Sequence, residues 1–228
     1  MSEVRLIAMT DWRSSKDNGM IEIPQAEDLI SYCARVSNPK NQENFETSEK
    51  LLKYCIDHQH WSIFEMVHVV MEIKTTRDIG RQIIRHRSFS FQEFSQRYAE
   101  VSIEDFEYRE PRLQDTKNRQ NSIETTDEEV IDTWFDLQDD VIGIAAEAYK
   151  TALNMGIAKE QARALLPEGM TKSTMYMAGS LRSWIHYCDL RRDEATQKEH
   201  RDVADKCWNL LRNEFSFLKE YERKLSDE

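Results

Sequence analysis

The sequence of 228 residues lacks the patterns that mark several common classes of protein. No apolar run approaches the ~20 residues that a membrane-spanning helix needs, and the first residues lack the basic-then-apolar order of a secretory signal. The two common phosphate-binding loops, GxGxxG and GxxxxGK(S/T), are absent, and so is the GxSxG nucleophile turn. Any phosphate must therefore be held by arginine side chains, hydroxyl groups and helix ends.

Cysteine is scarce: the chain has four, far apart, and they form no CxxC pair. Apolar periodicity places all of them on the inner faces of expected helices, where a thiol is inert. They are typical of reduced, buried cysteines in a cytoplasmic protein. None is a candidate nucleophile: Cys33, Cys55, Cys188 and Cys207.

The chain also has fewer basic than acidic residues, 31 against 42, so its net charge is −11. Sequence-independent binding of nucleic acid depends on neutralising phosphates, so this chain is a poor candidate for it. Against that background, residues 75–98 are basic and also aromatic. Asp78 and Glu93 alone oppose the arginines of this stretch, which are Arg77, Arg81, Arg85, Arg87 and Arg97.

Two interpretations of residues 75–98 stand side by side. Arginine-rich runs are usually solvated surface. However, Phe89, Phe91 and Phe94 are too apolar for a free loop, and guanidinium forks bind phosphate or carboxylate in a bidentate manner while phenylalanine rings stack on flat rings. The stretch therefore predicts a site for a small, phosphorylated, heterocyclic ligand.

Apolar periodicity predicts an α+β fold, with an antiparallel or mixed sheet flanked by helices and a helix-rich C-terminal half, in a single domain over residues 1–228. Residues 11–24 and 87–97 are expected to be loops, and residues 100–126 a polar, flexible excursion. Thr47 and either Thr75 or Thr76 are expected to cap helices. Strands are expected at 4–9 and 66–74, and helices at 25–36, after 47, and from 75 or 76 to about 86, with Ile79, Ile83 and Ile84 facing the core.

In the second half, capping boxes at Thr126-x-x-Glu129 and Thr196-x-x-Glu199 predict the starts of two helices. The first is the longest periodic run of the chain, and Gly156 is expected to end it. Its apolar stripe indicates core or a subunit interface. Further helices are expected at 159–166 and 173–190.

Two polar clusters in the first half have more than one interpretation. His58 and His60, with Glu65 nearby, do not have the i, i+4 spacing of a helical zinc site, so no metal is expected. We expect His60 and Ser62 to contact the edge of a ligand instead. Ser37, after Ala34-Arg35-Val36, is either a ligand contact or only a helix terminator.

Arg85-His86-Arg87, followed after seven residues by Ser95 in RHRSFSFQEFSQRY, resembles the signature of the flavin-dependent thymidylate synthases. Further pieces resemble that family in the same order along the chain. They span most of the sequence: 34–37, 58–65, 162–167 and 179–191.

The resemblance implies an α+β homotetramer whose sites lie between subunits. Its members methylate dUMP to dTMP, taking the carbon from methylenetetrahydrofolate and a hydride from FAD that NADPH reduces. The implied FAD-binding residues are Ser37, His60, Ser62, Arg85, His86, Arg87, Glu93, Ser180, Arg182 and His186. The implied dUMP-binding residues are Gln82, Arg85, Glu93, Phe94, Ser95, Gln96, Arg97, Arg163 and Arg191.

Within this set, the resemblance implies that Arg97 and Arg163 clamp the phosphate and that Arg191 stabilises negative charge at the pyrimidine. Ser95 is either a nucleophile or a hydroxyl that orients the ligand. The chain departs from the family pattern in small ways, at Gln92, Met66, Ser180 and His186. Two other functions remain: a single-stranded nucleic-acid-binding module built on 77–98, and an inactive structural homologue.

Overall fold

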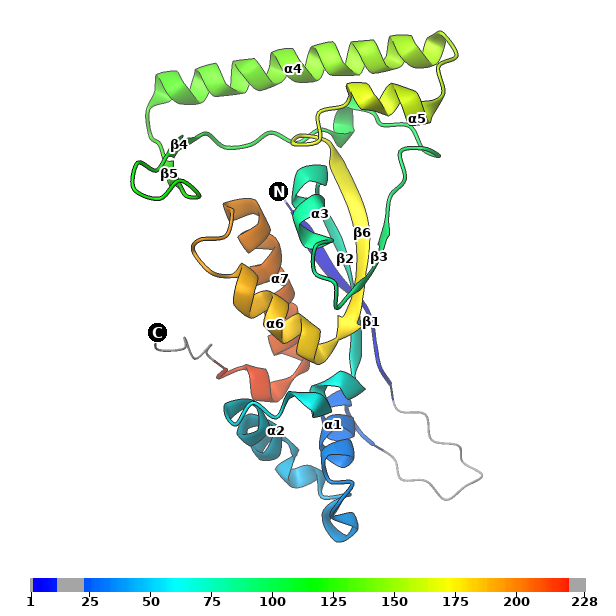
Figure 1. Ribbon diagram of the computed structural model, residues 1–228, viewed down its shortest axis with the longest axis vertical. Coiled ribbons are helices and arrows are strands. Elements are labelled where there is room, and N and C mark those ends of the chain that lie inside the picture. The colour runs from blue at the N-terminus through cyan, green and yellow to red at the C-terminus, as the bar shows by residue number, and fades with distance from the viewer. Residues whose placement is uncertain (1, 12–22, 222–228) are drawn as a thin grey trace.

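The computed structural model describes residues 2–11 and 23–221. Most of the loop expected at 11–24 lies outside the described residues. The molecule is elongated, with a sheet along its middle, the long helix α4 (Glu128–Asn154) across one end, and α1 (Ala26–Ala34) and α2 (Ser48–Asp57) at the other (Figure 1).

The main sheet has four antiparallel strands in the order β1-β2-β6-β3. Strands β2 and β6 form its centre and pair along their whole length, from His68 opposite Ser180 to Thr76 opposite Lys172. Every second residue from Val67 to Ile73 is fully buried, which confirms the predicted strand. The strands are β1 (Glu3–Met9), β2 (His68–Thr76), β6 (Lys172–Ser180) and β3 (Ser90–Glu93).

Two segments differ from the prediction. The helix expected at 173–190 is a strand, β6, followed without a loop by helix α6 (Leu181–Arg191). Ser180 marks the change, because its hydroxyl accepts a hydrogen bond from the Ser183 backbone N–H (3.3 Å) and caps α6. The loop expected at 87–97 contains β3, which pairs with Met175–Ala178 of β6.

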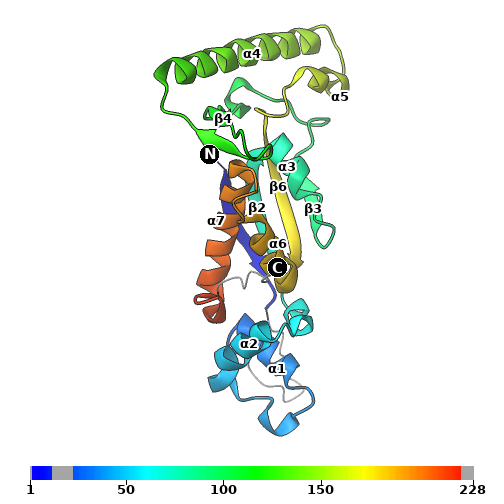
Figure 2. The same cartoon turned by 60° about the vertical axis from the view of Figure 1, so that its left-hand side comes forward.

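Helices α6 and α7 (Lys198–Glu214) lie on one face of the sheet, and α3 (Arg77–Ile83) follows directly from β2 (Figure 2). The main core lies between this face and the helices and includes Phe64, Trp184 and Trp208. Ile79 and Ile83 are fully buried there as predicted, whereas Ile84 is 37% exposed. Ile84 lies at the C-cap of α3, where the chain leaves the helix, so its position no longer follows the helical period.

The helix caps are only partly as predicted. Asp127, not Thr126, caps α4, and its carboxylate accepts from the N–H groups of Glu129 and Val130. Helix α7 follows Gln197 without a side-chain cap, so the expected box at 196–199 does not form. Thr47 and Thr76 occupy the cap positions of α2 and α3, but neither hydroxyl caps its helix.

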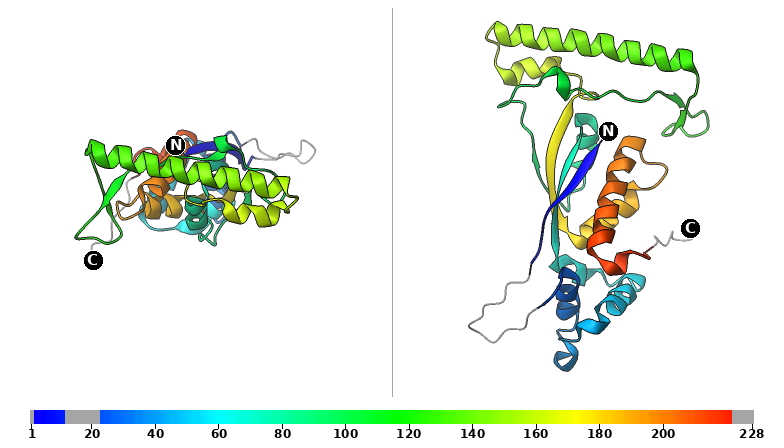
Figure 3. Two further views of the ribbon diagram at one scale, coloured as in Figure 1. Left: turned by 90° about the horizontal axis from the view of Figure 1, so that it is seen from above. Right: turned by 180° about the vertical axis from the view of Figure 1, so that it is seen from behind.

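Helix α4 lies across the end of the sheet when the molecule is seen from above (Figure 3). It ends at Asn154, and Gly156 then adopts a positive φ of 80°, as the predicted helix end requires. A second, smaller core around Phe106, Ile142 and Tyr149 lies beneath it. Much of the predicted stripe nevertheless faces outward, and the exposed fraction is 54% for Leu137 and 73% for Met155.

The region expected to be a flexible excursion contains a short hairpin of β4 (Arg112–Gln114) and β5 (Ser122–Glu124). The single turn α5 (Lys159–Ala162) continues into the 3-10 turn η6 (Arg163–Leu165), in place of the expected helix over 159–166. Other 3-10 turns are η2 (Pro39–Asn41), η3 (Phe45–Thr47), η4 (Trp61–Met66), η5 (Ile103–Asp105) and η7 (Ser216–Leu218). No helix in the described part of the chain has the length and apolar character to cross a membrane.

Candidate functional site

The turn that carries Arg85, His86 and Arg87 joins α3 to β3, and Phe89 anchors it to the sheet. Phe89 is buried, with its ring edge-on to Trp184 at 4.9 Å between centroids. It lies directly against Gly179 of β6: a Cβ at that position would be 2.5 Å from Phe89 Cδ1. The missing side chain of Gly179 therefore makes the room in which the turn is fixed.

His86 and Arg191 meet at the end of α6. The Nε–H of Arg191 donates to His86 Nε2 at 2.9 Å. A guanidinium only donates, so His86 must be unprotonated at Nε2. Burial, and then the charges of Arg191 and Arg85, lower the pKa of His86 to about 4. His86 is therefore neutral near pH 7 and orients Arg191, whose four other N–H groups are not used by His86.

Arg85 and Arg87 flank His86 with exposed side chains. Neither side chain makes a hydrogen bond or ion pair with another residue that the structure describes. The turn thus presents two free guanidinium groups beside the neutral histidine, which is an arrangement suited to an anionic ligand.

Ser95, Arg97 and Arg163 form a second group, at the end of the sheet nearest α5. The Arg97 guanidinium lies 3.2 Å from the Glu160 carboxylate, and Arg163 Nε donates to the Glu160 carbonyl at 3.2 Å. Ser95 Oγ accepts from the Arg97 backbone N–H. The exposed Arg97–Glu160 pair is weak, so an incoming phosphate can compete with Glu160 for Arg97.

The residues between these groups are partly engaged. The Glu93 carboxylate accepts from Ser173 Oγ at 2.8 Å and lies 3.3 Å from Arg77. Phe94 is exposed, whereas Gln96 is 3% exposed and its side-chain Nε2 has no hydrogen-bond partner. A buried donor without a partner is costly, and a ligand oxygen at this point would satisfy it.

A third group surrounds the start of α6. Arg182 pairs with Glu65 of η4 at 2.9 Å, and the His186 ring lies 4.5 Å from that of Trp61. Burial and the charge of Arg182 lower the pKa of His186. The cap residue Ser180 belongs to the same end of the sheet, and the exposed His60 and Ser62 flank Trp61. Ser37 is exposed in the turn that follows α1.

These groups do not meet within one chain. The third group lies at the Ser180 end of β6, whereas the second group precedes the Lys172 end. The nine residues of β6 lie between them, and from the first to the last of these the strand spans roughly 27 Å at ~3.4 Å per step. The first group is held together by the contact of His86, which follows α3, with Arg191 at the end of α6.

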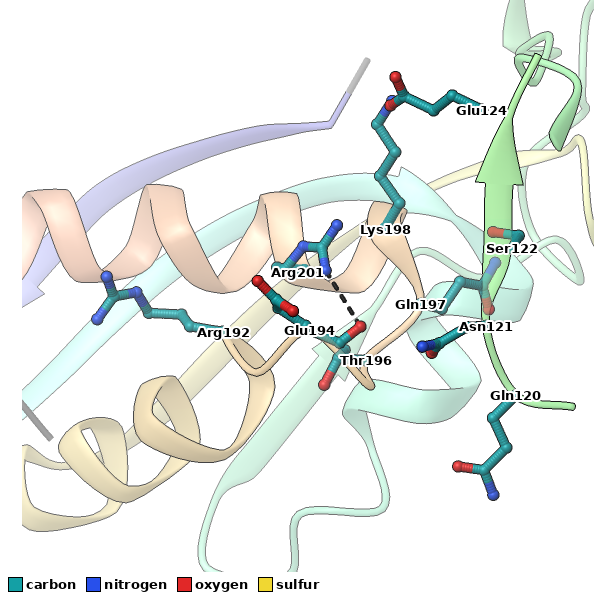
Figure 4. A pocket seen from close by; sticks show the side chains of 10 residues that line it. All are labelled: Gln120, Asn121, Ser122, Glu124, Arg192, Glu194, Thr196, Gln197, Lys198 and Arg201. Atoms are coloured by element: carbon teal, nitrogen blue, oxygen red, sulfur yellow. Dashed lines mark hydrogen bonds and ion pairs between the residues drawn. The ribbon is translucent and has the colours of Figure 1, made fainter. Parts of the chain in front are cut away.

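A polar cavity of about 490 Å³ opens beside Arg192, between β5 and the start of α7 (Figure 4). None of the predicted site residues lines it. Its cations have partners: Lys198 pairs with Glu110 and Glu124, and Arg201 donates to the Glu194 carbonyl. The cavity therefore does not belong to the predicted site.

The four cysteines are free thiols in the structure. Burial raises the pKa of each, and the pKa of Cys188 and of Cys207 lies far above its usual value. None belongs to the three groups described above. The prediction that no reactive thiolate is present agrees with these surroundings.

Sequence reasoning missed His200 and Tyr187, which support the first group from behind. His200 is fully buried between Gln82 and Tyr187. A signal for its burial was present, because His200 precedes the inward Val203 and Cys207 by three and seven residues, the helical repeat.

Comparison with known proteins agrees with this arrangement. Residues 20–215 match the family described as thymidylate synthase complementing protein. A probable flavin-dependent thymidylate synthase of Paramecium bursaria Chlorella virus 1 is 51% identical over 190 residues, which cover 83% of this chain and 87% of the relative. The flavin-dependent thymidylate synthase of Synechocystis sp. is 51% identical over 203 residues, 89% of this chain and 90% of the relative.

The fold is similar to a solved structure of the UMP/dUMP methylase PolB from Streptomyces cacaoi bound with 5-Br dUMP. The TM-score is 0.80, with 23% sequence identity, over 96% of this chain and 93% of PolB. This likeness confirms the α+β fold. The family match and the two relatives show that the chain belongs to the flavin-dependent thymidylate synthase family of enzymes.

Proposed function

We propose that this protein methylates dUMP to dTMP, with FAD as its bound flavin, NADPH as the reductant of the flavin and methylenetetrahydrofolate as the carbon donor. Residues 1–228 act as one unit in the reducing cytoplasm, which suits the four free thiols. The observation that carries the proposal is the contact between neutral His86 and Arg191 (2.9 Å).

Arg191 has a role that the geometry of this contact supports. Methylation at a pyrimidine carbon requires the ring to become nucleophilic, and negative charge then develops on its oxygen atoms. A guanidinium held by a neutral imidazole keeps its full charge and its remaining donors for that oxygen. A protonated His86 would repel Arg191 and could not accept its N–H, so the low pKa of His86 is part of the arrangement.

The described residues fit both a dinucleotide and a nucleotide phosphate. Arg85 and Arg87 offer unpaired guanidinium groups, and Gln96 offers a buried donor that lacks a partner. Arg97, Arg163 and Ser95 supply charge and a hydroxyl in one place for the dUMP phosphate. Flavin, when bound, supplies the hydride, and the protein supplies orientation and charge.

No thiol takes part in the proposed reaction. In the folate-only thymidylate synthases a cysteine activates the pyrimidine, but the four thiols here are held in the protonated form by burial. Ser95 is the other nucleophile-shaped candidate. Among the described residues no histidine or carboxylate is hydrogen-bonded to its Oγ, so we assign Ser95 to orientation of the ligand and not to attack.

The homotetramer with sites between subunits is part of the proposal. The separation of roughly 27 Å between the second and third groups, at ~3.4 Å per strand residue, is what a site completed by other chains requires. Helix α4 offers an apolar stripe for such contacts, because Trp134, Leu137 and Val141 are exposed on it.

The test is anaerobic incubation of the purified protein with dUMP, methylenetetrahydrofolate and NADPH, scored for dTMP with and without added FAD. We expect dTMP only when flavin is present. Formation of dTMP without any flavin, or none under complete conditions with flavin bound, would contradict the proposal.

A further inference from the structure

His200 is the only fully buried histidine among the described residues, and it lies behind the candidate site. It stands in the first turn of α7, and each of its ring nitrogens has one partner. Nδ1 is 3.3 Å from Gln82 Oε1, and Nε2 is 3.2 Å from the Tyr187 hydroxyl. Since Gln82 is a candidate dUMP contact, its orientation bears on recognition of the base.

A chain of hydrogen bonds that begins at a carboxylate fixes this orientation. Glu199 can only accept, so Gln197 must turn Nε2 towards it (2.9 Å). Gln197 Oε1 then faces Gln82, which must donate through its own Nε2 (2.7 Å). Gln82 Oε1 is left facing His200, so His200 is protonated at Nδ1. Nε2 of His200 then accepts the proton of Tyr187.

The charge states that this chain requires are those that the surroundings impose. Burial by itself would raise the pKa of Glu199, but hydrogen bonds from Arg112, from the backbone and from Gln197 bring it below its usual value, so Glu199 is ionised. Burial, followed by the charge of Arg191 and the charge that His86 gains at low pH, lowers the pKa of His200 to about 3. His200 is therefore neutral and has one fixed tautomer.

The same network contacts the hydrogen-bonded pair of His86 and Arg191. Gln82 precedes His86 by four residues, and His86 receives Arg191. The His86 ring is edge-on to Tyr187 at 4.9 Å between centroids. Tyr187 thus contacts both His200, the partner of Gln82, and His86, the partner of Arg191.

A fixed carboxamide can distinguish two pyrimidines. After its contacts with His200 and Gln197, Gln82 retains one free lone pair on Oε1 and one free N–H on Nε2. Uracil presents N3–H beside the O4 acceptor, which matches this order. Cytosine presents an N3 acceptor beside an N4 amine, which would require the carboxamide turned by 180°.

We propose that His200 is a positioning residue that locks the Gln82 carboxamide in the orientation that selects uracil nucleotides over cytosine nucleotides. The proposal rests on the proposed function, because it takes Gln82 to face the pyrimidine. His200 contacts neither the base nor the flavin and acts through Gln82.

Two variants of His200 test this with the same functional group. In H200N the amide nitrogen is as many bonds from Cβ as Nδ1 is, so it can still donate to Gln82. In H200Q it is as many bonds from Cβ as Nε2 is, so it reaches Tyr187 and not Gln82. Equilibrium affinities of the flavin-loaded, full-length protein for dUMP and dCMP are measured by calorimetry. The readout is the ratio of the two affinities.

We expect the wild type to favour dUMP, H200N to keep most of the ratio, and H200Q to narrow it by about tenfold or more, since the site can then turn its amide. Y187F removes the other hydrogen bond of His200 and should keep the ratio, which a merely structural role would not predict. Should H200Q fail to fold, H200F also removes the hydrogen bond to Gln82 and retains an aromatic ring.

Equal ratios in H200N and H200Q, or in wild type and H200F, would overturn the inference. So would a wild type that makes dTMP yet binds dUMP and dCMP equally, a result that leaves the proposed function standing. A wild type that binds no dUMP and makes no dTMP would remove both.

Discussion

Gly179→Ala is expected to displace the Phe89 ring and, with it, the turn that carries Arg85, His86 and Arg87. The new Cβ would lie 2.5 Å from Phe89 Cδ1 and 2.7 Å from Cε1. Carbon atoms prefer a separation of ~3.5–4.0 Å, so the ring must move by about 1 Å. Over-packing of this kind costs ~1–3 kcal/mol.

The ring has little space in which to move, because Trp184 and Tyr187 lie on its other sides at centroid distances of 4.9 and 6.0 Å. Phe89 is only two residues from Arg87. The displacement should therefore reach the turn that carries the two free arginines. We expect a lower stability and, in the folded fraction, a weaker affinity for dUMP.

The assay is unfolding by urea, followed by tryptophan fluorescence at one protein concentration, because assembly would otherwise change the midpoint. Gly143→Ala is the matched control. Gly143 lies within α4, nothing is within 4 Å of a Cβ there, and alanine in a helix is favoured over glycine by ~1 kcal/mol. G143A should be neutral or stabilising.

A double-mutant cycle with Phe89→Leu makes the reasoning refutable. A smaller side chain removes the collision, so G179A should cost less in the F89L background, with a coupling of ~1 kcal/mol or more. An unchanged midpoint for G179A, or strictly additive effects, would show that Phe89 does not rest on Gly179 as described.

Three further predictions concern chemistry and pH. Ser95→Ala should weaken dUMP binding or slow turnover without eliminating it; total inactivity with normal dUMP affinity would make Ser95 a nucleophile. Replacement of all four cysteines by alanine or serine should leave dTMP formation intact, and one essential cysteine would refute the thiol-free route. The folded-state pKa values of His86 (about 4) and His200 (about 3) lie below the usual 6.5, so below pH 6.5 the folded protein binds fewer protons than the unfolded chain. The contribution of these two histidines to the free energy of unfolding is therefore complete above pH 6.5 and is lost as the pH falls towards 3. Urea midpoints from pH 7 to 4 should therefore decline, and less steeply in H200N; equal slopes would contradict the assignment.

The strongest periodic segments could be predicted from sequence, and the reasons are physical. Strand β2 has fully buried apolar residues at every second position from Val69 to Ile73, and α4 repeats its apolar residues over many turns. The sequence does not show where β6 ends and α6 begins, because the strand passes from Ser180 directly into the helix at Leu181 without a proline or a loop. The methionines of β6 are also compatible with either a strand or a helix. Strand β3 has four residues, too few for a period to show.

The site was predicted as a set of residues but not as an arrangement. The arginine-rich stretch and its resemblance to a family identified the candidates. Their division among three places depends on the antiparallel pairing of β2 with β6, which no local pattern specifies. Glu93 was predicted to contact ligands, yet its carboxylate is engaged by Ser173 and Arg77, because β3 places it beside β6.

The most direct test of the central claim is formation of dTMP by Arg191→Ala under anaerobic single-turnover conditions, measured together with the flavin content of the same sample. Removal of one preorganised donor to developing charge typically costs ~10²–10³ in rate, so we predict at least this loss, with flavin still bound. An R191A protein that loses its flavin but makes dTMP at the wild-type rate once flavin is restored would show that a guanidinium held by His86 does not activate the pyrimidine.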